Sequence, residues 1–193
     1  MNYTEAREFI LEKLKRELPP NLYYHGIHHT HDVFESADRI AMMENITGGD
    51  LDLLRTAALF HDVGFLIKYK SNEEESAVLA REILPGFDYT HEQIERICRM
   101  ILSTKIPQAP EDILDQILCD ADLDYLGRDD FFTTALKLKR EWYDHGMKTT
   151  LKEWYLQEYD FLMQHRFFTN SAKALRLEKK KKHLSEIKEL LSQ

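Results

Sequence analysis

Apolar side chains recur three and four residues apart along most of the 193-residue chain. This spacing is typical of amphipathic α-helices, because it gathers the apolar groups on one helix face. The alternation of apolar and polar residues that predicts β-strands is not convincing anywhere in the sequence. A first helix is predicted to end before Pro19, and further helices are predicted over about residues 29–43, 53–61, 71–84, 91–102, 111–127, 129–142, 151–168 and 171–191.

The breaks between these segments carry residues that usually end or begin helices. Pro19-Pro20 closes the first helix, and Asp50 and Thr90 are predicted to cap two later ones. The sequence has no internal repeat and no low-complexity linker. A chain of this length is long enough for one well-buried domain and short for two. We therefore predict an all-α protein in which residues 1–193 form a single domain.

Composition restricts the partners of this chain. The formal net charge is −8, which argues against a surface built for nucleic acid or anionic membranes. No uncharged apolar run approaches the roughly 18 residues of a membrane span, and the polar start does not resemble a signal peptide. Cys98 and Cys119 are interpreted as reduced core thiols. We expect a cytoplasmic protein that binds neither nucleic acid nor membranes.

The segment "LFHDVGF", residues 59–65, places His61 and Asp62 side by side among apolar residues. A buried charge is costly unless it is paired or coordinates a metal ion. The pair therefore needs partners from elsewhere in the chain. Candidates are His25, His28, His29 and His31 in "YYHGIHHTHDV" and Asp120, Asp122 and Asp124 in "LCDADLDYLG".

Imidazole and carboxylate together suit divalent ions such as Mn, Fe, Co, Ni and Zn, and Mg is a further option. A site with two histidines and two aspartates leaves coordination positions open for water. Hydrolysis needs this arrangement, because a metal ion lowers the pKa of a bound water towards neutrality. We expect one tightly bound divalent ion.

The order His, His-Asp, Asp resembles the HD-domain superfamily of metal-dependent phosphohydrolases. The segments "HTHDVFESADRIA", "LRTAALFHDVGF", "EESAVLAREIL", "IERICRMILSTK" and "DADLDYLG" follow in the order expected for that family. The resemblance covers roughly residues 20–130, and it implies a compact helical HD core there. The helices of about residues 131–193 are expected to pack on that core.

The resemblance implies the metal ligands His29, His61, Asp62 and Asp122. Two of these assignments have competitors at the level of the sequence. His28 and His31 are the alternatives to His29. They lie on another face of the predicted helix, so a site that used them would be formed by a different face of that helix. Asp120 competes with Asp122, and it lies about 200° further round a helix.

The segment "YHGIHHTHDV" also resembles the metal-site motif of cyclic-nucleotide phosphodiesterases. This alignment supports His29 as the first ligand and places His25 where those enzymes have their general acid. Gly26 replaces the asparagine of that motif, so the match is incomplete. Asp62 is expected both to bind the metal and to orient the attacking water. The alternative role of His25 is a hydrogen-bonded loop residue.

Three further residues are predicted to contact substrate: Lys105, Arg55 and His91. A cation near the metal would hold phosphate oxygens, although each of these residues has an ordinary surface role as its alternative. Glu75 could orient a metal-bound water. His91 is the only histidine between Asp62 and Asp122, which argues against the six-ligand di-iron site of related oxygenases.

The predicted activity is the hydrolysis of a phosphoester in a nucleotide-like small molecule by a metal-activated water. Phosphodiester hydrolysis, for example of a cyclic nucleotide, is one alternative, and a non-catalytic binding module with a vestigial site is another. The amphipathic C-terminal helix could pack on its own domain or form a homodimer. The aromatic residues between positions 131 and 168 are predicted to be mostly core, with one or two lining the substrate cleft.

Overall fold

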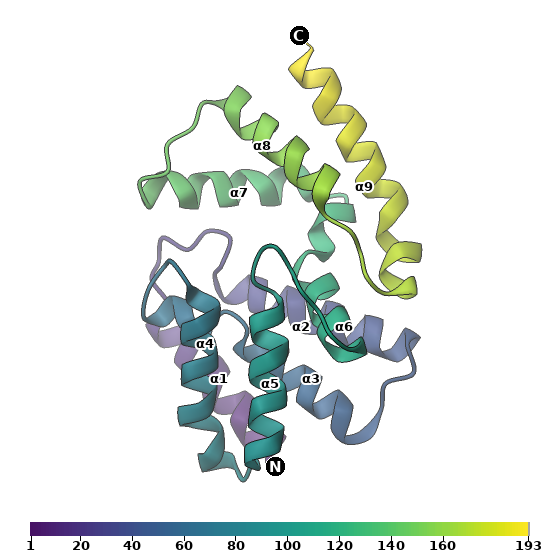
Figure 1. Ribbon diagram of the computed structural model, residues 1–193. Helices are drawn as coiled ribbons and strands as arrows, with labels where there is room; N and C mark the ends of the chain where they lie inside the picture. The colour runs from purple at the N-terminus through teal and green to yellow at the C-terminus, as the bar shows by residue number, and fades with distance from the viewer. Residues whose placement is uncertain (193) are drawn as a thin grey trace.

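The computed structural model describes residues 1–192, and it is helical throughout (Figure 1). The described residues form nine α-helices and three short 3-10 helices and contain no β-strand, which confirms the predicted all-α class. The elements are α1 (Tyr3–Glu17), α2 (Ile27–Met43), α3 (Gly48–Phe60), η1 (Val63–Leu66), α4 (Asn72–Ile83), η2 (Leu84–Phe87), α5 (His91–Ser103), α6 (Ile113–Asp122), η3 (Asp124–Gly127), α7 (Phe131–Asp144), α8 (Leu151–Gln164) and α9 (Asn170–Leu191).

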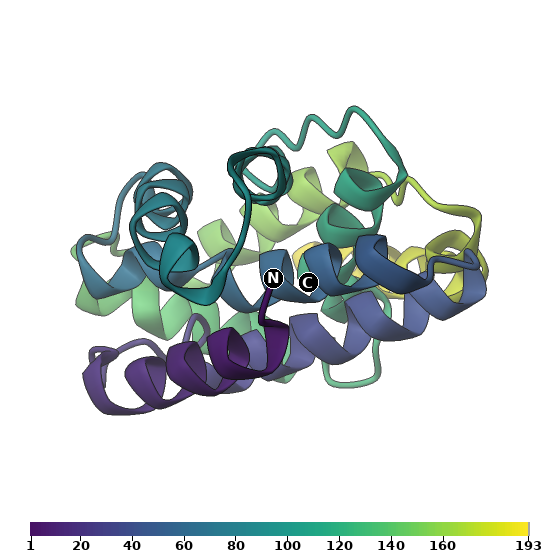
Figure 2. The same cartoon turned by 90° about the horizontal axis from the view of Figure 1, so that it is seen from below.

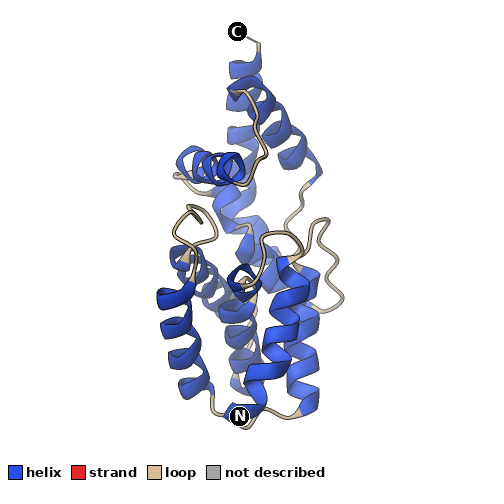
Figure 3. Ribbon diagram, turned by 90° about the vertical axis from the view of Figure 1, so that its left-hand side faces the viewer, coloured by secondary structure: helices blue, strands red, loops and turns tan. Residues whose placement is uncertain are grey.

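The helices form two tiers. Helices α1 to α6 make the lower bundle in Figure 1, in which α2 packs against α3 and α6, and α4 packs against α5. Helices α7, α8 and α9 lie above this bundle, as Figure 3 shows from the side. Figure 2 shows α4 and α5 nearly end-on, beside α1, α2 and α3. One cluster of buried apolar residues extends from α1 to α9 through both tiers.

Two predicted helices are shorter than the sequence suggested. The segment predicted as a helix over 111–127 begins at Ile113, leaves α-geometry after Asp122 and continues as the 3-10 turn η3. The helix predicted to reach residue 168 ends at Gln164. The cause of the second difference is Asp120, whose carboxylate accepts hydrogen bonds from the backbone N–H groups of Phe168 and Thr169. These bonds hold the segment before α9 in an extended form.

Helix starts agree with the capping predictions at one position and differ at another. Thr90 caps α5 in a capping box with Gln93, as predicted. Helix α3, in contrast, begins at Gly48 after Thr47, so Asp50 lies in its first turn and is not its cap. A carboxylate in the first turn still interacts favourably with the positive end of the helix dipole.

Gly64 sets the distance between η1 and α4. A Cβ atom at this position would lie 1.9 Å from the backbone oxygen of Asn72, so any side chain would force the two segments apart. The close approach is fixed by the Gly64 N–H, which donates to the Ser76 hydroxyl at 2.8 Å. As a result, the start of α4 lies directly beside the His61-Asp62 pair.

Among the residues that the structure describes, no helix has both the length and the apolar character needed to cross a membrane.

Candidate metal centre and adjoining pocket

Four side chains from separate parts of the lower bundle meet at one point. His29 comes from the second half-turn of α2, His61 and Asp62 follow the end of α3, and Asp122 is the last residue of α6. One ligand atom each of His29, His61 and Asp122 lies within 4.8 Å of the other two. The apolar faces of the three helices are buried against one another, so packing of the core brings these polar groups together.

The distances between these atoms suit a single small cation. His29 Nε2 lies 3.1 Å from Asp122 Oδ1, 3.3 Å from His61 Nε2 and 3.4 Å from Asp62 Oδ2. His61 Nε2 lies 3.2 Å from Asp62 Oδ2 and 3.6 Å from Asp122 Oδ1. Ligand atoms about 2.1 Å from one transition-metal ion are separated by about 3.0–3.5 Å in tetrahedral or octahedral geometry. His29, His61 and Asp122 could therefore hold one ion with little rearrangement, and Asp62 Oδ2, within 3.4 Å of both histidine nitrogens, is placed to be a fourth ligand.

Hydrogen bonds to His61 and Asp62 orient these two residues towards this point. His61 Nδ1 lies 2.8 Å from the carbonyl oxygen of Ala58, which makes Nδ1 the donor and leaves the Nε2 lone pair free. Asn72 Nδ2 donates to Asp62 Oδ1 at 2.8 Å. The other oxygen of Asp62, Oδ2, is buried without a hydrogen-bond partner among the described residues. An orphaned carboxylate oxygen facing two imidazole nitrogens is what a metal site requires.

Electrostatics also favour a cation here. Burial alone would lower the pKa of His61, but the adjacent carboxylates of Asp62 and Asp122 outweigh it and raise that pKa to about 9. Burial would raise the pKa of Asp62, yet the charge of His61 lowers it well below its ordinary value. Two carboxylates in a buried site thus need positive charge, which a divalent ion can supply.

The structure separates the competing candidates from this point. His28 and His31 are both exposed, and neither lies in the cluster. Asp120 is fully buried but faces away, and it accepts two backbone hydrogen bonds and the hydroxyl hydrogen bond of Thr169. Asp124 binds Arg39 and Arg176. These aspartates hold α9 and its preceding segment onto the lower bundle.

His25 lies beside the cluster and is held by a residue of the upper tier. Its Nδ1 atom is 2.5 Å from Glu141 Oε1, and the backbone N–H groups of Tyr24 and His25 both donate to Glu141 Oε2. Tyr69 donates a further hydrogen bond to Glu141. Burial lowers the pKa of His25, but the Glu141 hydrogen bond and the charge of Asp62 outweigh it and raise that pKa above its ordinary value. A protonated His25 can act as a proton donor.

A pocket of about 450 Å³ opens from the cluster and runs between the two tiers. Asp62, Asp122 and His25 line its inner end. No lysine or arginine lines it. The full lining consists of Tyr24, His25, Asp62, Asn72, Glu73, Thr104, Ile106, Asp122, Leu123, Tyr125, Leu138, Trp142, Trp154, Gln157, Glu158 and Phe161.

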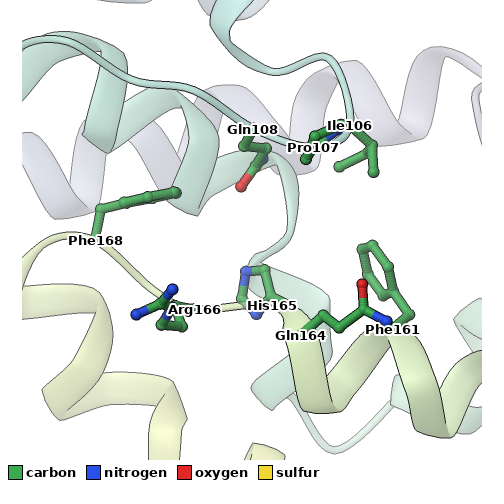
Figure 4. A pocket seen from close by; sticks show the side chains of 8 residues that line it. All are labelled: Ile106, Pro107, Gln108, Phe161, Gln164, His165, Arg166 and Phe168. Carbon is green, nitrogen blue, oxygen red and sulfur yellow. The ribbon is translucent and has the colours of Figure 1, made fainter.

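A second, smaller pocket of about 250 Å³ adjoins the first. Figure 4 shows its lining, with Phe161 from α8 and Ile106 from the α5–α6 loop at one end. The same two residues also line the larger pocket. The smaller pocket contains none of the residues of the His-Asp cluster.

The three residues predicted to contact substrate do not line the larger pocket. The Lys105 ammonium forms an exposed ion pair with Glu74, although its neighbours Thr104 and Ile106 do line it. Arg55 pairs with Asp38 on α2. The exposed His91 is the first residue of α5, about 18 Å along the helix axis from the end near the pocket. The structure therefore gives these predictions no support.

Several pocket residues were missed by sequence reasoning. Glu141 is fully buried and organises His25, yet it lies in an ordinary amphipathic helix far along the chain. Asn72 orients Asp62, whereas the predicted Glu75 forms an ion pair with Lys68. The prediction that one or two aromatic residues line the cleft was too low, because Trp142, Trp154 and Phe161 all do. No local signal in the sequence distinguishes these residues from their neighbours.

Comparison with known proteins supports the interpretation of the cluster. Residues 26–124, just over half of the chain, match the family model of the HD domain. This range contains all four residues of the cluster. No curated protein and no solved structure matches the sequence. Because the matched range covers more than half of the chain, we conclude that this protein belongs to the HD domain family, whose members are generally metal-dependent hydrolases.

Proposed function

We propose that this protein is a metal-dependent phosphohydrolase that cleaves a phosphoester of a nucleotide-like small molecule. The observation that carries the proposal is the convergence of His29, His61, Asp62 and Asp122 with interatomic distances that suit one divalent ion. A divalent ion held there would lower the pKa of a coordinated water and so supply the nucleophile for attack on phosphorus.

The chain's own residues have distinct roles in this reaction. Asp62, fixed by Asn72, orients the attacking water through its carboxylate. His25 donates a proton from Nε2 to the leaving oxygen, because its Nδ1–H is held by Glu141. Glu141 also stabilises the imidazolium form before transfer, in the way that a buried carboxylate holds a catalytic histidine in one tautomer.

The charge of the pocket explains why the reaction depends on the metal. Asp62, Asp122, Glu73 and Glu158 line the pocket, and no lysine or arginine accompanies them. A phosphate group would be repelled by these carboxylates unless a divalent cation and a protonated His25 offset them. Binding of the phosphate group and activation of water therefore depend on the same ion.

The test begins with metal content and hydrolysis of p-nitrophenyl phosphate. Protein stripped with chelator and reloaded separately with Mn, Fe(II), Co, Ni, Zn or Mg should bind about one ion per chain and hydrolyse the ester with at least one of them. Inorganic phosphate should bind the reloaded protein and not the stripped protein. If the protein binds metal and nucleotide but hydrolyses no ester, it is a non-catalytic binding module and the proposed enzyme activity is wrong.

Phosphodiester hydrolysis is the second candidate function. It is favoured by the position of His25 beside the cluster, because "YHGIHHTHDV" resembles the phosphodiesterase motif that has its general acid at this place. Bis(p-nitrophenyl) phosphate tested beside the monoester separates the two. A strong preference for the monoester contradicts the diester activity.

A further inference from the structure

The part of the larger pocket that is lined by α8 contains a buried carboxyl group without a partner among the described residues. Glu158 on α8 lines the pocket, its residue is only 6% exposed, and its Oε2 atom is buried without a hydrogen-bond partner among the described residues. Burial raises the pKa of Glu158 to about 7. An unpaired carboxyl in such a place costs stability, which requires an explanation.

A complementary donor lies one helical turn earlier on the same helix. The indole Nε1–H of Trp154 is also buried without a hydrogen-bond partner among the described residues, and Trp154 lines the same pocket. Residues four apart lie on the same face of a helix. Although Trp154 and Glu158 are such a pair, they do not hydrogen-bond to each other. An unused donor and an unused acceptor therefore border one cavity.

The rest of this end is apolar and largely aromatic. The apolar lining of the pocket beyond the cluster includes Trp142 and Phe161 together with the aliphatic side chain of Leu138, and Tyr125 lies nearer the cluster, with its ring 5.4 Å from that of Tyr24. Phe161 stands between this pocket and the smaller one, at the position seen in Figure 4. Flat aromatic walls accommodate a planar ring, and a few unpaired polar groups among them are what gives a small-molecule pocket its specificity.

We propose that Glu158 and Trp154 recognise the hydrogen-bonding edge of a planar heteroaromatic group on the substrate. The Glu158 carboxyl accepts a hydrogen bond from an N–H of that group, and the Trp154 indole donates to an adjacent ring or carbonyl acceptor. Nucleobases carry this combination of donor and acceptor. The inference rests on the proposed function, because it requires the phosphate of the same molecule to lie at the metal end of the pocket.

The distribution of polar groups supports this orientation of the substrate. The metal end carries the cluster and His25, which suit an anionic phosphate once a cation is bound. Among the described residues no lysine or arginine lines the pocket, so a second phosphate or a carboxylate would be poorly held beside α8. A ligand with an anion at one end and a neutral hydrogen-bonding edge at the other matches both the metal end of the pocket and the part beside α8.

The experiment compares kcat/KM for the four common nucleoside monophosphates with that for ribose 5-phosphate, which has the same phosphate and sugar but no base. We expect wild-type protein to prefer at least one nucleotide. Glu158→Gln should lower the ratio of that nucleotide to ribose 5-phosphate by about 10-fold or more, since a mismatched hydrogen-bonding edge leaves buried polar groups unpaired. Trp154→Phe, which keeps the aromatic wall, should lower the same ratio.

The matched control is Asp160→Asn, an acid-to-amide change on the exposed side of α8. The ratio should stay at the wild-type value in this variant. The inference is overturned if wild-type protein hydrolyses these phosphate esters but neither Glu158→Gln nor Trp154→Phe changes the ratio. Absence of metal-dependent hydrolysis for every ester, including p-nitrophenyl phosphate, overturns the proposed function itself, so the two failures are distinguishable.

Discussion

The two ends of the large pocket are built from different parts of the chain. At the inner end, His29, His61, Asp62 and Asp122 all lie within the range that matches the HD domain. At the outer end, Leu138 and the residues contributed by α8 lie beyond that range. The inner end is polar and its side chains are oriented by hydrogen bonds, whereas the outer end is aromatic and leaves Trp154 Nε1 and Glu158 Oε2 unpaired.

This difference indicates a division of tasks. Coordination of a cation restricts both ligand type and geometry, so the inner end follows the pattern of the family. The outer end has only to fit the organic part of a ligand, which different helices can achieve in different ways. Glu141 connects the two ends of the pocket, because it belongs to the upper tier and yet holds His25 at the inner end. The predictions below test this division.

The largest effect is expected for Asp62→Ala. Metal content should fall from about one ion per chain to near zero, and hydrolysis should fall by more than about 1000-fold, because the pKa of water is no longer lowered. Elemental analysis and p-nitrophenyl phosphate hydrolysis measure the two effects, and circular dichroism checks that the fold persists.

Asp120→Asn is the control for this prediction. It should keep its metal but unfold at a lower temperature, since Asp120 accepts hydrogen bonds that hold the start of α9. Loss of metal in Asp120→Asn with retention in Asp62→Ala would reverse the assignment of the ligands.

His25→Asn should have the next largest effect, and that effect should depend on the leaving group. Loss of a general acid slows hydrolysis of an alkyl phosphate by about 100-fold or more. Hydrolysis of p-nitrophenyl phosphate should fall much less, because p-nitrophenolate leaves without a proton. His28→Asn, a change in an exposed neighbour outside the pocket, is the control. Equal losses on both substrates in His25→Asn would show that His25 is not the proton donor.

The inner end could be anticipated from the sequence for a physical reason. A histidine and an aspartate in the apolar segment around residue 61 need partners, and the ordered His and Asp residues elsewhere supplied candidates. The choice of Asp122 over Asp120 came from the family resemblance, and the structure separates the two, since Asp120 is fully buried whereas Asp122 is half-buried at the pocket. One of them faces the cluster, and the other binds the backbone before α9.

The contribution of the upper tier could not be anticipated. Glu141 lies between Arg140 and Trp142 in an amphipathic helix, where a glutamate is usually exposed. Its burial depends on packing against Tyr24 and His25 in the segment before α2, and His25 is 116 residues earlier in the chain. Hydrophobic periodicity predicts such a helix but not which of its polar residues a distant segment will cover.

Glu158→Gln should change how stability depends on pH. The folded pKa of about 7 lies above the ordinary value of 4.5, so the folded protein holds this proton more tightly than the unfolded chain. Wild-type protein therefore loses stability as pH rises from about 4.5 through 7, by an upper limit of about 3 kcal/mol. The glutamine variant lacks this loss, so its stability relative to wild type should increase over that interval. Urea unfolding of both proteins at about pH 5 and pH 8 measures this change in relative stability. If the difference in free energy of unfolding between variant and wild type is the same at both pH values, Glu158 is not a buried carboxyl with a raised pKa.

Asn72→Ala tests how the inner end is supported. Removing the hydrogen bond to Asp62 Oδ1 should weaken metal affinity by about 10- to 100-fold without removing a ligand. Competition with a calibrated chelator measures the affinity. Glu75→Ala, three residues further along α4 and paired with Lys68, is the matched control and should keep wild-type affinity. If both variants bind metal as wild type does, Asp62 is positioned by packing alone.

The smallest effect is expected for Lys105→Gln. Its ammonium pairs with Glu74 at the surface and does not line the pocket, so kcat/KM should fall less than about fivefold. The result bears on the whole pocket, because no lysine or arginine lines it. If kcat/KM falls more than tenfold because KM rises, Lys105 exchanges its partner Glu74 for the substrate phosphate. The inner end of the pocket would then bind the substrate phosphate through a lysine side chain as well as through a metal ion. The difference in composition between the inner and outer ends would be smaller than the lining residues indicate.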